Sequence, residues 1–64
     1  MITRYTVVSH FGVDEFSSHD EAGVRFREVL SKGSPAKLYY EEFHLKFTKR
    51  MLLSSATPGS VYSL

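Results

Sequence analysis

One segment of the sequence carries both the start and the stop signals of an α-helix. Ser18 can accept a hydrogen bond from the first turn, and Glu21 can reach back to the N–H of Ser18 to complete a capping box. Gly33 can adopt the left-handed conformation that ends a helix, and Lys32 suits the negative end of the helix dipole. Between these signals four apolar residues recur at helical spacing on one stripe: Ala22, Phe26, Val29 and Leu30. The chain is therefore predicted to contain one helix that buries a single face.

Two further features of this helix follow from residue spacing. Glu21 precedes Arg25 by four positions, and Glu28 precedes Lys32 by four, so each pair is predicted to form a surface ion pair. Gly23 lies beside the apolar stripe and is expected to let the helix backbone approach a sheet closely, at a cost of roughly 1 kcal/mol relative to alanine.

The N-terminal segment has the composition of a strand. Residues 2–11 alternate and are rich in β-branched and aromatic residues, which suit a half-buried pleated surface. Gly12 permits a turn, and residues 12–18 (GVDEFSS) are predicted to form a loop before the helix.

Residues 38–53 (LYYEEFHLKFTKRMLL) allow two interpretations. As a helix, the segment would begin well at Ser34 and Pro35, but it would be apolar on two sides in a chain too small to cover both. As a strand, it alternates strictly over residues 43–47 and is rich in aromatic residues. We favour one long strand, with a bulge or turn at residues 48–50, where the alternation breaks.

The strand interpretation predicts an α+β fold, a single small domain of β-α-β(-β) type with one helix packed on a small sheet. Its core is expected to combine the helix stripe with the strand face that carries Phe43, Leu45 and Phe47. Tyr39 and Tyr40 would point to opposite faces, so that one anchors the core and the other is offered outward.

The domain is predicted to span residues 1–53. Residues 54–64 would be a serine-rich tail or, after a turn at Pro58 and Gly59, a short edge strand over residues 60–64.

The small size of the chain limits its stability. A domain of 64 residues buries only about 60% of the surface that its unfolded chain exposes, and this one has no cysteine for a disulfide or a thiolate zinc site. Pairing with a partner protein, or with a second copy as a homodimer, is the remaining way to add buried surface. No apolar run is long enough for a membrane span and no secretion signal is evident, so we expect no membrane association and a cytoplasmic location.

The sequence offers little for catalysis. The histidines at positions 10, 19 and 44 are scattered, and no phosphate loop or nucleophile-elbow motif is present. Glu41 and Glu42 are adjacent, so in a strand they cannot share one site. We expect a protein that is not an enzyme and that uses no metal and no cofactor.

Charge is unevenly distributed along the chain, although the formal net charge is only +1. Four acids and no base lie within residues 13–21, and no acid follows Phe43. Lys46, Lys49 and Arg50 surround Phe47, and such interleaving of cations with aromatic residues is compatible with stacked nucleic-acid bases and phosphates. A small nucleic-acid-binding regulator is therefore one hypothesis, although the near balance of charge disfavours it.

A protein-binding module is the hypothesis we favour, because an exposed strand edge and paired tyrosines suit protein interfaces. The order of strand, helix opened by "SSHDEA" and following "AKLYYEEF" resembles the small accessory proteins of bacteriophages, over roughly the first two-thirds of the chain. The resemblance implies a protein that inhibits or redirects a host partner by occupancy, and it transfers no residue role. The predicted partner contacts lie on the outward face and basic end of the long strand: Tyr40, His44, Lys46, Lys49 and Arg50.

Overall fold

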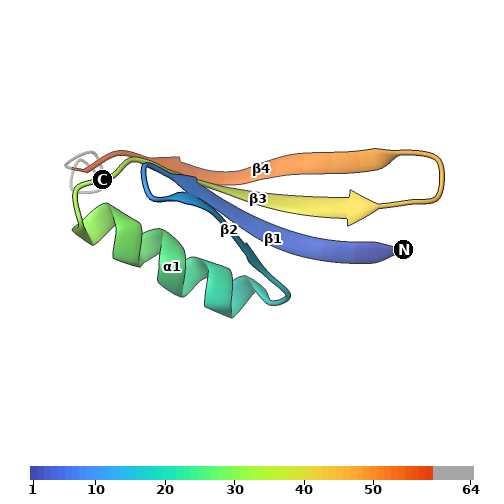
Figure 1. Ribbon diagram of the computed structural model, residues 1–64, viewed down its shortest axis with the longest axis horizontal. Coiled ribbons are helices and arrows are strands. Elements are labelled where there is room, and N and C mark those ends of the chain that lie inside the picture. The colour runs from blue at the N-terminus through green and yellow to red at the C-terminus, as the bar shows by residue number, and fades with distance from the viewer. Residues whose placement is uncertain (59–64) are drawn as a thin grey trace.

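The computed structural model describes residues 1–58, which form a four-stranded antiparallel sheet with one helix on one face (Figure 1). The elements follow the order β1 (Ile2–Ser9), β2 (Gly12–Phe16), α1 (His19–Ser31), β3 (Ala36–Phe43) and β4 (Thr48–Ala56). The strands lie side by side as β2-β1-β3-β4, so that β2 and β4 form the edges. The predicted α+β fold is confirmed.

Strand β2 was not expected. The residues predicted as a loop pair with β1 in a tight hairpin, with Ser9 opposite Gly12 and Tyr5 opposite Phe16. Gly12 has a φ of +115°, which L-residues rarely adopt, so the glycine read as a turn signal begins the strand instead. The acidic residues at positions 14 and 15 make this strand look like a loop in the sequence. They are tolerated because an edge strand can expose charged side chains to water.

The predicted long strand is in fact two. Strands β3 and β4 form a hairpin whose turn covers residues 44–47, and the N–H of His44 donates to the carbonyl of Phe47 at 2.9 Å. The strict alternation that favoured a strand thus falls on the turn, and residues 48–50, predicted as a bulge or turn, begin β4. The register shift lies further along, where Leu38 pairs with Ser54 and Tyr39 with Leu52. The extended backbone excludes the helical alternative for the segment.

The helix begins and ends at the predicted signals. The Ser18 hydroxyl accepts from the N–H of Glu21 at 3.2 Å, and Gly33 has a φ of +89°. The return half of the capping box differs, because the Glu21 carboxylate accepts from the Ser18 hydroxyl rather than from its backbone N–H.

One of the two predicted ion pairs of the helix forms. Lys32 lies 3.9 Å from Glu28, as predicted. Arg25 instead pairs with Glu28 and reaches across to Asp14 of β2, so the predicted pair with Glu21 is wrong. Gly23 does not serve a close approach to the sheet, since a Cβ built there would meet only the Arg27 side chain at 3.6 Å.

The core lies under the helix and is smaller than predicted. The helix stripe is confirmed, but its partners come from β1 and the first half of β3: Val7, Ala36 and Leu38 are buried with Ala22 and Val29. Tyr5, Phe16, Phe26 and Leu30 pack around them. The predicted contribution of residues 43–47 is wrong, because Leu45 is fully exposed and Phe47 is 59% exposed.

Length explains where the core ends. A helix of 13 residues spans about 20 Å, whereas the molecule is 40 Å long. The helix therefore covers one half of the sheet, and the β3–β4 hairpin and the start of β1 extend past it (Figure 1). We call residues 40–51 the outer hairpin and its turn, residues 44–47, the tip.

Strand β4 continues to Ala56, so residues 54–56 belong to the sheet. The short strand expected over residues 60–64 lies outside the described residues. Within residues 1–58, α1 is too short and too polar to cross a bilayer.

Candidate functional site

The sheet face opposite the helix, here called the open face, is covered by its own long side chains. Glu41 of β3 lies at the centre of this face and its residue is only 8% exposed. Its Oε1 accepts from the Thr6 hydroxyl at 2.6 Å and from Nε of Arg4 at 3.0 Å, while Oε2 lies 3.3 Å from Nε of Arg50. The carboxylate is thus fully partnered, as a nearly buried charge must be.

Two arginines complete this layer by lying over aromatic rings. The guanidinium carbon of Arg50 is 3.7 Å from the centre of the Tyr39 ring, and that of Arg4 is 4.5 Å from the centre of the Phe43 ring. Arg4 also pairs with Glu15 of β2 at 2.8 Å. The polar layer therefore ties all four strands together, since β2, β1, β3 and β4 each supply a member.

The hydrogen bond from Thr6, then the hydrogen bond from Arg4 and the positive charges of Arg4 and Arg50, hold the pKa of Glu41 below its usual value of 4.5, although burial acts in the opposite direction. The charged form is the form that the site stabilises. Glu41 is therefore an organising charge of the sheet rather than a proton donor at neutral pH.

A second cluster lies on the helix face of the sheet, beyond the end of the helix. The Tyr40 hydroxyl donates to Oε2 of Glu42 at 2.9 Å, and Nε2 of His44 lies 3.0 Å from Oε1 of the same carboxylate. The His44 ring stacks on Phe47 with centroids 4.3 Å apart. Tyr40 in turn packs against Tyr5, and Tyr5 against His19 at the start of α1. A continuous set of contacts therefore links the helix to the tip.

This cluster shifts two ionisation equilibria. Hydrogen bonds from His44 and then Tyr40 lower the pKa of Glu42, and Lys49, opposite Glu42 in the ladder, acts in the same direction. The bond to Glu42 raises the pKa of the Tyr40 hydroxyl. Near neutral pH the carboxylate is charged, accepts from Tyr40 and fixes the position of the His44 ring.

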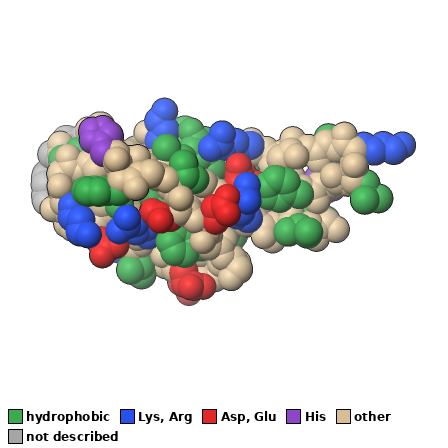
Figure 2. Space-filling model, viewed as in Figure 1, with side chains coloured by type: hydrophobic (Ala, Val, Ile, Leu, Met, Phe, Trp, Pro, Cys, Tyr) green, Lys and Arg blue, Asp and Glu red, His purple; other side chains and the backbone are tan. Residues whose placement is uncertain are grey.

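The tip combines exposed apolar groups with cations. Leu45 is fully exposed and Phe47 is 59% exposed, while Lys46 and Lys49 lie beside them on the turn and on β4. Figure 2 shows this narrow end of the molecule, where hydrophobic and basic side chains are visible and no acidic one is. The tip is therefore a protruding apolar surface bordered by positive charges.

The five predicted contact residues do not form one surface. Tyr40, His44 and Lys49 gather around Glu42 on the helix face, and Lys46 lies in the tip. Arg50 lies on the opposite face, over Tyr39, because the turn reverses the chain and pairs Glu41 with Arg50. The prediction that the two tyrosines face opposite sides is confirmed, although both are half-buried and Tyr40 lies on the helix face.

Sequence reasoning missed Leu45 and Phe47, which it assigned to the core, and Glu42, which organises the cluster. No single local signal marks them. Adjacent exposed apolar and basic residues in a turn become recognisable only when the turn itself is located.

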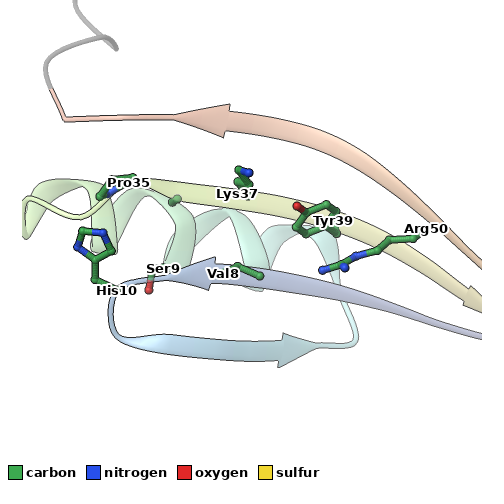
Figure 3. A pocket seen from close by; sticks show the side chains of 8 residues that line it. Val8, Ser9, His10, Pro35, Lys37, Tyr39 and Arg50 are labelled. Atoms are coloured by element: carbon green, nitrogen blue, oxygen red, sulfur yellow. The ribbon is translucent and has the colours of Figure 1, made fainter.

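A shallow recess of about 410 Å³ lies on the open face, away from the tip (Figure 3). Val8 and Ser9 of β1, His10, and Pro35, Lys37 and Tyr39 line it, and the Arg50 side chain reaches in from β4. None of these lining residues, all within the described part of the chain, is acidic. Such a surface suits a negatively charged group better than a positive one.

Within residues 1–58 no three side chains of the metal-binding types gather closely enough to hold an ion. Comparison with known protein families, curated proteins and solved structures finds no match for the chain. The geometry described above therefore carries the functional argument alone.

Proposed function

We propose that this protein is a non-catalytic binding module, located in the cytoplasm, that inhibits or redirects a partner protein by occupying its surface with the tip of the outer hairpin. The observation that carries the proposal is the combination of exposure and order at residues 44–47. Leu45 and Phe47 expose apolar surface to water, yet the ring of Phe47 is held by His44, and His44 by Glu42.

Order at the tip matters because immobilising side chains on binding costs about 0.5–1.5 kcal/mol each. A stacked pair that is fixed before binding avoids part of that cost. The chain of contacts from His44 through Glu42 and Tyr40 to Tyr5 provides such fixation from the folded body of the protein.

The chemistry of the tip supports one kind of partner. An exposed leucine and phenylalanine favour an apolar pocket, and Lys46 and Lys49 favour acidic groups at its rim. Since the formal net charge of the chain is only +1, the positive potential is local to the hairpin.

A pair of matched variants tests this proposal. Phe47 and Val24 are each 59% exposed, but Val24 lies on the helix, away from the tip. In affinity capture from cells that naturally contain the chain, a specific partner should be retained by the wild type and by Val24→Ser, and lost with Leu45→Ser/Phe47→Ser. Purified partner should then bind the double variant at least tenfold more weakly. Equal retention by both variants would contradict the proposal, provided that both keep the wild-type urea midpoint.

The open face supports a second candidate, a nucleic-acid-binding regulator. Among the described residues that line the recess, Lys37 and Arg50 are basic, none carries a carboxylate, and Tyr39 offers an aromatic ring. Against this, the Tyr39 ring already lies under Arg50 and Glu41 is close by. Affinity for single- or double-stranded oligonucleotides that falls with added salt, and that Lys37→Glu weakens, would favour this candidate over the first.

A further inference from the structure

The recess on the open face brings three hydrogen-bond donors together. Lys37 and Tyr39 lie two positions apart on the same face of β3, and the Arg50 side chain reaches them from β4 (Figure 3). An ammonium, a phenolic hydroxyl and a guanidinium can donate to several oxygens of one anion. The described residues that line the recess therefore supply two fixed positive charges and no carboxylate.

These donors have capacity left in the folded protein. Within residues 1–58, Lys37 takes part in no ion pair, and the Tyr39 hydroxyl takes part in no hydrogen bond. Arg50 uses its Nε toward Glu41 at 3.3 Å, so its two terminal nitrogens can still donate to another acceptor. The guanidinium is also held 3.7 Å from the centre of the Tyr39 ring, which fixes its position before a ligand arrives.

The rest of the recess is less polar. Val8, Pro35 and Ala36 add apolar surface to its lining, and Pro35 and His10 lie at the end away from Arg50 (Figure 3). The volume of about 410 Å³ falls within the range of roughly 300–1,000 Å³ that is usual for small-molecule sites. The recess therefore has room for an organic molecule that carries an anionic group.

We propose that the recess binds a small organic phosphate monoester, with its phosphate between Lys37 and Arg50 and its apolar part against Val8 and Pro35. Near neutral pH a phosphate monoester carries a charge of about −1.5 to −2, which matches the two cations. Its three terminal oxygens match the three donor groups, and guanidinium groups bind phosphate through paired hydrogen bonds. A carboxylate offers only one charge and two oxygens.

Two carboxylates on the open face favour a compact phosphate over a long polyanion. Thr6 pairs with both Tyr39 and Glu15, so Glu15 lies in the same row of the sheet as Tyr39, and its side chain is 53% exposed. Glu41 lies one row closer to the tip. A chain of phosphates that followed the sheet would pass these like charges, whereas a single phosphate ester does not reach them. Because the tip lies outside the recess, this inference is independent of the proposed function.

Nuclear magnetic resonance of the nitrogen-15-labelled protein gives the first test, with phenyl phosphate as the probe at neutral pH and constant ionic strength. Amide signals of residues 8–10 and 35–39 should shift and saturate, with a dissociation constant on the order of 1 mM because the recess is shallow. Inorganic phosphate, which lacks the apolar part, and benzoate, which has one charge, should bind more weakly. Shifts that do not saturate, or equal affinity for either of these two anions, would overturn the proposal.

Variants then test the donors. Lys37→Gln should weaken phenyl phosphate binding about fivefold, since it removes one charge-assisted hydrogen bond at an exposed position. Tyr39→Phe should weaken it less, because the ring under Arg50 is retained and only the hydroxyl is lost. Lys46→Gln, at an exposed lysine of the tip, is the matched control and should leave the affinity unchanged.

Two further results would contradict the proposal. Equal weakening by Lys46→Gln and Lys37→Gln would show a general attraction to positive charge rather than a site. A single-stranded oligonucleotide that shifts the same amides and binds more tightly than phenyl phosphate would assign the recess to nucleic acid.

Discussion

The two halves of this sheet are stabilised by different forces. The half under α1 is held by apolar packing of Val7, Leu38 and Val29, whose side chains are almost completely buried. Within residues 1–58 no helix lies over the outer half, which is held by a polar layer in which Glu41 joins Arg4 and Arg50. A small protein can thus extend a hairpin well beyond its core, provided that charged and aromatic side chains cover the sheet.

The largest effect is expected in the packed half. Leu38→Ala should destabilise the protein by about 2–5 kcal/mol, because it removes a buried side chain and leaves a cavity. Leu45→Ala, the same change at a fully exposed position of the outer half, should leave the urea midpoint unchanged. Chemical denaturation of both variants measures the contrast, and a similar loss in both would show that the halves are not distinct.

The next effect concerns the polar layer. Glu41→Gln should cost about 2 kcal/mol, because the charge that two arginines and the Thr6 hydroxyl share is lost. Amide exchange should show the loss first in the outer hairpin. Glu15→Gln, at an exposed carboxylate that also pairs with Arg4, is the matched control and should cost less.

The same group makes stability depend on pH. The pKa of Glu41 is lowered in the folded state, so its contribution is complete above the unfolded value near 4.5 and is lost as the pH falls through the lower folded value. Urea midpoints between pH 7 and pH 2 should therefore fall on acidification. The urea midpoint of Glu41→Gln should fall less over the same pH range. An equal fall in the variant and the wild type would exclude Glu41 as the origin of the pH dependence.

Arg50→Glu distinguishes a structural arginine from a contact residue. The sequence alone predicts weaker partner binding at an unchanged thermal midpoint. The structure instead predicts a loss of about 1–2 kcal/mol, because the guanidinium over Tyr39 disappears and a second carboxylate faces Glu41. Thermal denaturation of Arg50→Glu and of Lys46→Glu, which makes the same charge change at the tip, separates the two expectations. The structure predicts a lower midpoint for Arg50→Glu only.

The smallest effect is a gain. Gly23→Ala should stabilise the protein by about 0.5–1 kcal/mol, since the position is helical and a Cβ there meets only the Arg27 side chain. Gly33→Ala, at a φ of +89°, should instead destabilise it. A loss of stability in Gly23→Ala would restore the idea of a close helix–sheet contact.

The helix was predictable because its signals are local. Ser18, Gly33 and the stripe that includes Val29 act within a few residues of one another, so their order in the sequence is enough. The first strand and the α+β class follow from composition in the same way. The two hairpins were harder to predict from the sequence, because strand β2 has acidic residues on an exposed edge and the β3–β4 turn contains neither glycine nor proline.

The residues of the candidate site could be predicted only if the position of the β3–β4 turn was known. Moving the chain reversal to residues 44–47 changes which face every later side chain occupies, because side chains alternate along a strand. Lys49 therefore joins Tyr40 and His44 on the helix face, while Arg50 moves to the open face. Leu45 and Phe47 move from the expected core to the tip.

The sequence by itself determined a short amphipathic helix, a strand-rich remainder and a cationic segment after Phe43, since each depends on neighbouring residues. Only the tertiary structure decided that the helix covers half of the sheet, that Glu41 is nearly buried between strands, and that β4 is an edge of the sheet formed by residues 1–58. These properties depend on the register between segments far apart in the chain, and hydrogen bonding and packing across strands fix that register.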